Sequence, residues 1–371
     1  MKQTVLFRIT LLLVFVFLLV VGMIYAKAFL VPVFFAGLLS LLLLPVSKKI
    51  QKFIPNEVCS IILSLVLFLI IICSVSYFIS TQVSNIISDY DMIESKIKTK
   101  AHALQATVNE YTGMDEKEQE AWFDKESEQL LKSGFQKGTT LLVGVGNFVF
   151  GLTLVMIYTF FLQLYRGKIK LFILSLIDEQ QHEKALSILN KVQSLVMHYI
   201  TGLCIALSII GVMNAVGLTL LGIEHGIFLG LLAGFLNIIP YIGSFVGAGL
   251  PMIMALIYKD SLWYPVGVLA IFMFNQFIDN NITTPNVVGG YVRLNSLATI
   301  FIVIIGGMIW GVAGMVLFIP LLGIFKIFCD HIEALKPLSI LLSDDESEEE
   351  SFFTKTFKKI KMKLFKKKIT S

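Results

Sequence analysis

FNQFIDNNITTPNVVGG, residues 274–290, is a polar stretch in the most apolar half of this sequence. Seven of the ten residues from Asn275 to Thr284 are polar, and Pro285 follows them. In a helix, residues three or four apart lie on the same side, so the stretch has an apolar and a polar face. The apolar face carries Phe274, Ile278 and Ile282, and the polar face carries Gln276, Asn280 and Thr283, with Asn275 and Asp279 beside them.

The composition predicts that this polar stretch belongs to a membrane protein. The 371 residues are 56% hydrophobic and 15% charged, and the mean hydropathy is +0.82. Soluble domains carry about 25% charged residues. Apolar residues also come in runs near the length of about 20 residues that crosses a hydrocarbon core. We therefore expect an all-α, polytopic protein in a lipid bilayer, and no nucleic-acid partner.

Eight apolar runs are candidates for membrane spans. They occupy residues 5–25, 29–46, 58–80, 140–165, 199–222, 226–257, 262–284 and 297–328. The first two are expected to form an uncleaved hairpin, although Ala26-Lys27-Ala28 has the form of a signal-peptide cleavage site. Runs 226–257 and 297–328 are too long for one straight crossing.

Basic residues in the short loops predict the orientation, because they stay on the cytoplasmic side. Lysines and arginines lie before the first run, between the second and third, between the fourth and fifth, and after the last. If every run crosses once, both termini are cytoplasmic. If 226–257 re-enters instead, a second re-entrant segment must compensate, or the lysine-rich tail would lie outside.

Three segments outside the runs are amphipathic or strongly charged. Residues 81–138 form an external insertion with heptad-like apolar spacing, expected to be either an antiparallel helix pair or a stalk for self-association. Residues 166–198 contain an amphipathic helix, expected to lie along the membrane surface or under the bundle. The tail, 341–371, is acidic and then lysine-rich, and it either binds anionic lipid or merely sets topology.

Signatures of soluble enzymes and of metal sites are missing from the sequence. There is no P-loop or HExxH motif, and the four cysteines and five histidines lack the spacing of metal ligands. We therefore expect no catalytic residue, no cofactor and no bound metal. Because no nucleotide-binding domain is encoded, transport energy would come from an ion gradient or from the gradient of the solute itself.

The polar face of 275–284 has two interpretations. A carboxylate at the bilayer centre costs at least about 2.5–3.5 kcal/mol, so the face would meet protein or a water-filled cavity. Alternatively, Asp279 lies about 24 Å along a helix that begins at Trp263 and is only an interfacial residue. Seven polar groups exceed what a helix end needs, and Pro285 with Gly289-Gly290 is expected to break the backbone. We favour the cavity.

A second interruption supports a site in this half of the chain. The run 226–257 contains Asn237, Pro240, Tyr241 and Gly243. Two discontinuous segments in one half of a membrane protein are the usual pointer to a transport site, and their helix ends offer partial charges. Arg293 is the only cation between Lys259 and Lys326, so it is either a partner for Asp279 or for an anionic group of the solute, or an interfacial residue.

Glycines recur every four residues in the same half of the chain. They are Gly226, Gly230 and Gly234, then Gly243 and Gly247, then Gly307 and Gly311. Small residues at this spacing let helices approach closely. The contacts could be static packing or surfaces that slide past one another.

Three motifs in order resemble the autoinducer-2 exporter family of bacterial membrane proteins. They are NIIPYIGSFVGAGLP (237–251), NQFIDNNITTP (275–285) and GGMIWGVAGMVLFIPLLG (306–323). The resemblance maps the family motif onto Pro240, Tyr241, Gly243, Gln276, Asp279, Asn280, Pro285, Gly306, Gly307, Gly311, Gly314 and Pro320. Asn295-Ser296 stand where a histidine-proline pair is expected, which puts a proton role there in doubt.

The resemblance implies export of a small polar signal molecule for some members and sodium- or lithium-for-proton exchange for others. It also implies a homo-oligomer in the bacterial cytoplasmic membrane. We expect a secondary transporter with N-terminal membrane segments (1–80), the insertion (81–138), a transport core (139–340) and the tail (341–371). Asp279 would bind a cation or proton, and the neighbouring amides the solute. The rivals are a cation/proton antiporter and a non-transporting assembly protein.

Overall fold

The elements in the described part of the chain are helices, as expected for the all-α class. The computed structural model describes residues 2–88, 149–240, 242–289 and 294–344, and the single residues 92, 95, 96 and 99. Within these ranges, the one strand-like pairing is an isolated bridge between Leu294 and Ser343. Most of the predicted insertion and nearly all of the tail lie outside the described residues, and so do the heptad-like stripe and the lysine-rich segment.

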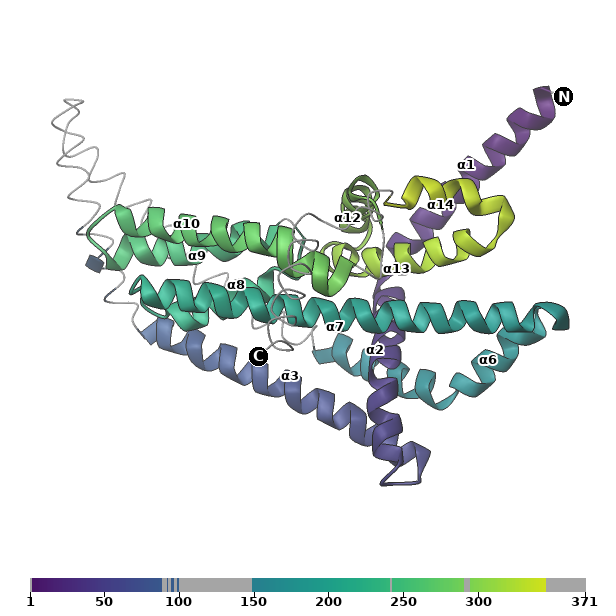
Figure 1. Cartoon of the computed structure of the whole chain (residues 1–371), viewed down its shortest axis with the longest axis horizontal. Coiled ribbons are helices and arrows are strands. Elements are labelled where there is room, and N and C mark those ends of the chain that lie inside the picture. Colours follow the sequence, from purple (N-terminus) through teal and green to yellow (C-terminus); the bar gives the residue numbers. More distant parts are fainter. Residues whose placement is uncertain are drawn as a thin grey trace, which may run out of the picture.

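Within each described range, short connections join the helices (Figure 1). The N-terminal helices are α1 (Lys2–Tyr25), α2 (Lys27–Gln51), α3 (Glu57–Ser88), a helix over Val149–Leu164, and α6 (Arg166–Ser175). The next are η1 (Glu179–Gln181), α7 (His182–Leu220), α8 (Gly226–Leu236), α9 (Ile242–Tyr258) and α10 (Trp263–Ile278). The last are η2 (Asp279–Thr283), η3 (Pro285–Gly289), α12 (Ser296–Trp310), α13 (Val312–His331), η4 (Glu333–Leu335) and α14 (Lys336–Leu342).

Among the described residues, length and apolarity support fewer single spans than the eight predicted. Four helices are long and apolar enough to cross a membrane: Lys27–Gln51, Glu57–Asn85, Glu179–Leu220 and Val312–His331. A fifth candidate is the pair Val149–Leu164 and Arg166–Ser175, which is bent by 64°. Shorter apolar helices occupy the remaining runs.

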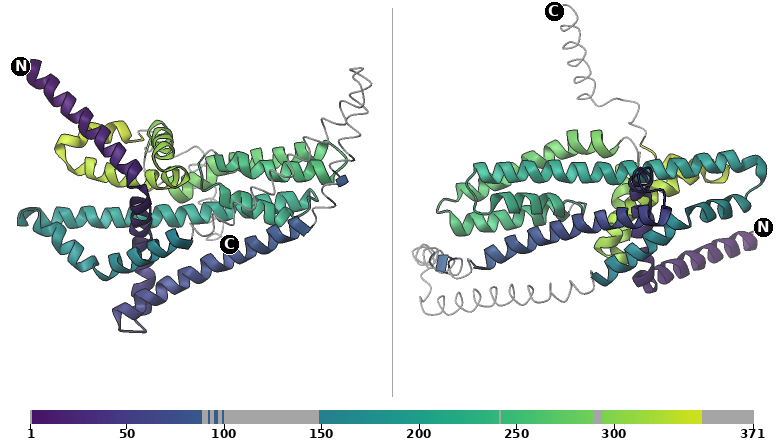
Figure 2. Two further views of the ribbon diagram at one scale, coloured as in Figure 1. Left: turned by 180° about the vertical axis from the view of Figure 1, so that it is seen from behind. Right: turned by 90° about the horizontal axis from the view of Figure 1, so that it is seen from below.

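The predicted hairpin of the first two runs is wrong. Ala26 alone separates α1 from α2, and its carbonyl accepts a hydrogen bond from Leu30 N at 2.9 Å. One residue cannot reverse a helical chain, because helix hairpins use loops of about 2–5 residues. The N-terminal end of α1 therefore projects from the molecule instead of lying along α2 (Figures 1 and 2), while its C-terminal end contacts α12. The side chains of Leu11 and Phe17 are more than half exposed on α1, an apolar surface suited to lipid.

Residues 166–198 contain helical structure, as predicted, but the amphipathic part is not a separate element. α6 covers only their first part, and residues 182–198 are the beginning of α7, which continues to Leu220. Between His182 and Gly202 the sequence contains no proline or glycine that would end a helix. The amphipathic and the apolar part therefore share one helix of 39 residues.

Both over-long runs fold as helical hairpins. In the run 226–257, α8 and α9 pack side by side on either side of the connection at 237–241. In the run 297–328, α12 and α13 reverse direction at Gly311, whose φ of +64° and ψ of −143° suit glycine alone. A Cβ on Gly314 would lie 1.9 Å from the carbonyl oxygen of Gly306, so these two helices touch backbone to backbone.

The glycines spaced by four residues bring α8 into direct contact with α7. A Cβ on Gly230 would lie 2.1 Å from Ala215 N, and one on Gly234 would lie 2.3 Å from Gly211 Cα. The close approach predicted from the sequence is confirmed here. Gly243 makes a similar contact between α9 and α8, since its Cβ would lie 2.0 Å from the Leu236 carbonyl oxygen.

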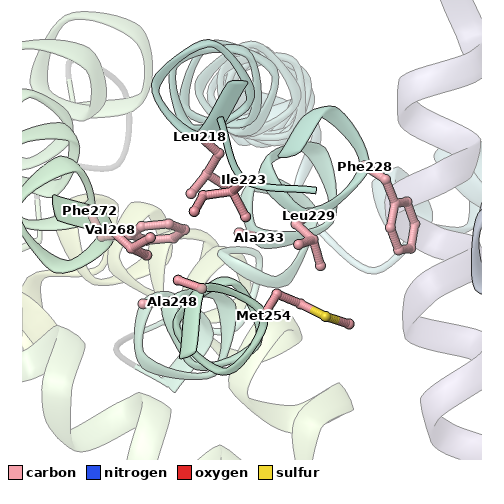
Figure 3. Close-up of a cluster of buried hydrophobic side chains, with 10 residues drawn as sticks. Leu218, Ile223, Phe228, Leu229, Ala233, Ala248, Met254, Val268 and Phe272 are labelled. Atoms are coloured by element: carbon pink, nitrogen blue, oxygen red, sulfur yellow. The ribbon is translucent and has the colours of Figure 1, made fainter. Parts of the chain in front are cut away.

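α8, α9 and α10 lie along the C-terminal half of α7 and form a four-helix unit (Figure 1). Its interior is a cluster of buried apolar side chains, shown in Figure 3. Leu218 and Ile223 come from the end of α7 and the turn after it, Leu229 from α8, Ala248 from α9 and Phe272 from α10. Because one face of α10 is held by this apolar cluster, the polar residues that follow it are oriented by the same packing.

Candidate functional site

The helix that begins at Trp263 changes form at Asp279. α10 is α-helical to Ile278, and the next turns, η2 and η3, are π-helical. Thr284, between η2 and η3, keeps helical backbone angles. The sequence predicted a break in the backbone at Pro285, but the helix widens there and continues. Proline has no N–H and removes an α-helical hydrogen bond. Wide π turns inside α-helices are uncommon and are often found at functional sites.

Two of the polar residues in this stretch serve the helix itself. Asn281 Nδ2 donates to the Phe277 carbonyl at 2.8 Å, and Asn286 Nδ2 donates to the Ile282 carbonyl at 2.6 Å. These amides give carbonyl oxygens of the widened turns a side-chain donor, a role that the sequence pattern did not indicate.

Asp279 lies in the protein interior, with 6% of its surface exposed. Its Oδ1 accepts a hydrogen bond from Thr284 Oγ1 at 3.0 Å, one turn further along the same helix. Its Oδ2 accepts one from Asn237 Nδ2 at 3.3 Å, at the end of α8. The carboxylate thus joins the two interruptions that the sequence singled out. Among the described residues, no lysine, arginine or histidine forms an ion pair with it.

Ser244 connects the two sides of this arrangement. Its hydroxyl oxygen, in the first turn of α9, lies 2.8 Å from Asn237 Oδ1 and 2.7 Å from Gln276 Oε1. A hydroxyl carries one proton, so it donates to one of the two amides at a time. Gln276 Nε2 in turn donates to Asn280 Oδ1 at 3.0 Å. The result is a chain of hydrogen bonds from Thr284 through Asp279 to Asn280.

The hydrogen-bonded chain forms part of the wall of a cavity of about 840 Å³. This size is within the range of about 300–1,000 Å³ that is typical of small-molecule sites. The polar wall is formed by Asn237, Ser244, Gln276, Asp279, Asn280 and Thr284. The other lining residues are largely apolar and include Leu203 and Leu207 of α7 and Phe272 and Met273 of α10. Apolar walls with a few convergent polar groups are the usual composition of a ligand pocket.

Not every residue proposed for the site faces the cavity. Pro240 and Pro285 line it, and Gly243 permits the tight connection beside Asn237. Thr283 is buried but is not among the lining residues. Asn275 points to α7 instead, where its Nδ2 donates to Asn214 Oδ1 at 2.8 Å.

Two further proposed residues, Tyr241 and Arg293, lie outside the described residues. The pairing of Arg293 with Asp279 therefore stays a prediction.

Sequence reasoning missed Ser244, Thr284 and Asn214. Ser244 and Thr284 each lie next to a residue that was selected, Gly243 and Thr283, so each falls on a neighbouring position of the same turn. Asn214 is a lone polar residue in an apolar run, and its partner is 61 residues away. No local pattern could have found that pair.

The comparison with known proteins covers most of the chain. A model of the family described as "AI-2E family transporter" matches residues 12–334. The "Putative transport protein YueF" of Bacillus subtilis is 26% identical over 319 residues, which cover 82% of this chain and 84% of YueF. The "AI-2 transport protein TqsA" of Escherichia coli is 32% identical over 154 residues, which cover 41% of this chain and 44% of TqsA.

The three motifs that suggested the family lie within the matched range, and the resemblance inferred from them is confirmed. A match over this much of the chain indicates that the protein is a membrane protein and a transporter. The chain belongs to the AI-2E transporter family of membrane proteins.

Proposed function

We propose that this protein is a secondary transporter that moves a small polar solute outward across the bacterial cytoplasmic membrane. The observation that carries this proposal is the Asp279–Asn237–Ser244–Gln276 chain in the wall of an 840 Å³ cavity. A buried carboxylate within membrane helices is costly and is retained where it serves function. The amides of Asn237 and Gln276 offer both donors and acceptors to a polar solute.

The two helical hairpins are compatible with a C-terminal tail in the cytoplasm. α8 has 11 residues and so measures about 16 Å, too short to cross a core of about 30 Å. If both hairpins, α8–α9 and α12–α13, enter the membrane and return to the side they came from, neither crosses it. The tail then lies on the same side as it would if each run crossed once. If 226–257 re-enters, a second re-entrant segment is needed to keep the lysine-rich tail inside the cell, and α12–α13 is that segment.

This topology favours loading of the cavity from inside the cell. Leu294, Ser296 and Asp344 line the cavity at the end that is continuous with the C-terminal segment. A cytoplasmic C-terminus puts that end on the cytoplasmic side, as outward transport requires. The name of the AI-2 transport protein TqsA gives AI-2 as its cargo, which supports a signal molecule of similar size here. Assembly as a homo-oligomer is part of the proposal, and the exposed apolar surface of α1 is available for it.

A sodium- or lithium-for-proton antiporter is the second candidate. The cavity is lined by two carboxylates, Asp279 and Asp344, and its described lining residues include no lysine, arginine or histidine. A cavity of this charge attracts cations and repels anions. The same carboxylate could therefore exchange a metal cation for a proton, with or without an organic solute.

The test uses purified protein in proteoliposomes and cells with and without the gene. Asp279→Asn keeps the size of the side chain and removes its charge, and Glu333→Gln, exposed and outside the cavity, is the matched control. We expect Asp279→Asn to abolish release of the solute found by comparing culture medium with cell contents. Sodium-driven proton movement, measured with an enclosed pH dye and lost in Asp279→Asn, would favour the antiporter.

An assembly protein without transport activity predicts a different result. Under that alternative, Asp279→Asn and Gln276→Ala leave every flux unchanged, while deletion of residues 81–138 or of the lysine-rich tail abolishes function. Unchanged fluxes in both variants, with the protein correctly inserted, would end the transporter proposal.

A further inference from the structure

The lining of the cavity changes from polar to apolar along two neighbouring helices. α9 and α10 lie side by side and run in opposite directions, because a connection of only four residues joins them (Figure 1). The contact between Ser244 and Gln276 brings the polar positions of both helices together. From there the lining continues to Met252 on α9 and to Leu269 on α10, about 12 Å and about 10 Å along the helix axes. The lining residues of these helices in between are apolar: Phe245, Ala248, Gly249, Phe272 and Met273.

The polar part of the cavity presents hydrogen-bond acceptors close together. Each oxygen of the Asp279 carboxylate accepts one hydrogen bond, from Thr284 or from Asn237, whereas a carboxylate has room for about four. The hydroxyl of Ser244 lies between the side-chain carbonyl oxygens of Asn237 and Gln276 and has one proton for the two. One carbonyl oxygen and the carboxylate therefore remain open to donors from a solute.

The charge of Asp279 favours a cation as that donor. Within the described ranges, the carboxylate is buried without an ion pair, and the cavity lining includes no lysine, arginine or histidine. A buried charge without a counter-ion is destabilising, so a positively charged solute gains more from this position than a neutral one, and an anion is repelled. A primary ammonium group combines one positive charge with three N–H donors.

The apolar part of the cavity distinguishes an organic amine from a metal ion. Hard metal cations are held by oxygen ligands, and the lining of α10 from Leu269 to Met273 offers no side-chain oxygen. Hydrocarbon groups, in contrast, are stabilised when they leave water for such a lining. A solute that uses both parts of the cavity therefore carries a charged end and an apolar body.

We propose that the solute of this cavity is a protonated primary amine with an apolar body. Its ammonium group donates to the Asp279 carboxylate and to the side-chain carbonyl oxygen of Asn237 or Gln276. Its hydrocarbon body lies along α9 and α10, against Phe272 and Leu269. The inference rests on the proposed function and narrows its solute from small polar molecules to amines.

The first experiment compares ligands on the purified protein and needs no transport measurement. Isothermal titration calorimetry in detergent at pH 7 uses 2-phenylethylamine, 2-phenylethanol and phenylacetate, which share an apolar body and differ in the charge of the head group. An alkyl amine, like the lysine side chain, is protonated at this pH. We expect 2-phenylethylamine to bind about tenfold more tightly than the alcohol, because hydrogen bonds to charged groups are the stronger ones, and the anion to bind more weakly still. Methylamine, which lacks the body, should bind about tenfold more weakly than 2-phenylethylamine.

Two pairs of variants assign the two ends of the ligand. Asp279→Asn should remove the preference for the amine over the alcohol, while Glu333→Gln, exposed and outside the cavity, should keep it. Leu269→Ala should weaken binding of 2-phenylethylamine by about three- to tenfold and leave methylamine binding unchanged. Leu250→Ala is its matched control, because Leu250 is 41% exposed against 43% for Leu269 and does not line the cavity.

The outcomes separate this inference from the proposed function. The amine solute is overturned if the alcohol binds as tightly as the amine, if folded protein binds no amine, or if the preference survives Asp279→Asn. When Asp279→Asn nevertheless abolishes release of the cellular solute, the transporter stands with a solute of another class. When the amine binds as expected but Asp279→Asn leaves every flux unchanged, the proposed function falls and the binding site stands.

Discussion

Asn275 of α10 donates a 2.8 Å hydrogen bond to Asn214 of α7, and both side chains are buried, with 5% and 3% of their surfaces exposed. Neither residue lines the cavity. The pair joins the helix that carries Asp279 to α7, the longest of the described helices, one turn before the Asp279-bearing helix widens. Its role is to set the position of α10 along α7.

Removal of one member of this pair should destabilise the protein. Asn214→Ala leaves the Asn275 amide buried without its partner, which costs about 1–3 kcal/mol. Thermal unfolding in detergent should show a lower Tm for Asn214→Ala. Asn281→Ala is the control, because Asn281 is exposed and bonds only within its own helix, so its effect should stay within about 0.5 kcal/mol. Equal Tm values for the two variants would contradict a structural role for the pair.

Gly230→Ala should disrupt the contact between α7 and α8. The new methyl group would lie 2.1 Å from Ala215 N, and backbone atoms cannot move aside as a flexible side chain can. Overpacking of this kind costs about 1–3 kcal/mol or more. The yield of folded protein and its Tm in detergent measure the effect. In Gly37→Ala, the matched control in α2, the added methyl group meets nothing within 4 Å, so the helix should gain up to about 1 kcal/mol.

Ser244→Ala should weaken solute binding without unfolding the protein. The hydroxyl bonds with Asn237 and Gln276, and its loss frees both amides to turn away from the cavity. A lost neutral hydrogen bond of about 0.5–1.5 kcal/mol corresponds to a rise in KM of about two- to tenfold. Flux measured against solute concentration gives this value. Ser208→Ala removes an exposed hydroxyl that bonds only to the Cys204 carbonyl of the same helix, and its KM should not change.

Gly311→Ala should destabilise the α12–α13 hairpin through the backbone alone. No atom lies within 4 Å of a Cβ at this position, so there is no collision to relieve. The cost comes from the backbone angles of this residue, φ of +64° and ψ of −143°. Residues other than glycine adopt this region at a cost of about 1–3 kcal/mol. Gly22→Ala, which also meets nothing within 4 Å but lies in α1 with helical backbone angles, should raise its Tm slightly, as Gly37→Ala should. Equal Tm values would show that the turn can relax.

The sequence predicted the location of the site better than its local geometry. The polar residues at 275–284 and the interruption at Asn237 were both visible as departures from apolar runs, and the structure brings them within hydrogen-bond distance. The widened helix was not predicted, because proline and glycine were expected to break the backbone. Side-chain amides can bond to backbone carbonyls, and Asn281 and Asn286 do so here. Composition does not distinguish that role from a role in binding.

The errors in the fold have physical reasons as well. The predicted hairpin of α1 and α2 was wrong because an apolar run indicates that a segment lies in lipid but does not indicate in which direction the chain runs. Only the one-residue connection at Ala26 indicates that the chain cannot reverse there. The amphipathic helix within 166–198 is present, but its expected end was wrong, because a change from an amphipathic to an apolar pattern was taken as a boundary. Without a residue that ends a helix, α7 continues through that change. The lengths of 226–257 and 297–328, by contrast, correctly indicated that neither is one straight helix.

The glycine contacts also limit how the protein can change shape. Gly230 and Gly234 hold α8 against the backbone of α7, and Gly243 holds α9 against the end of α8, so none of the three helices can roll or translate alone without steric collision. Static packing is therefore the better interpretation of these glycines than sliding surfaces. A transition that presents Asp279 to the other side of the membrane would have to carry α7, α8 and α9 as one rigid body. The displacement would then fall at α10 and at the connections that lead into it.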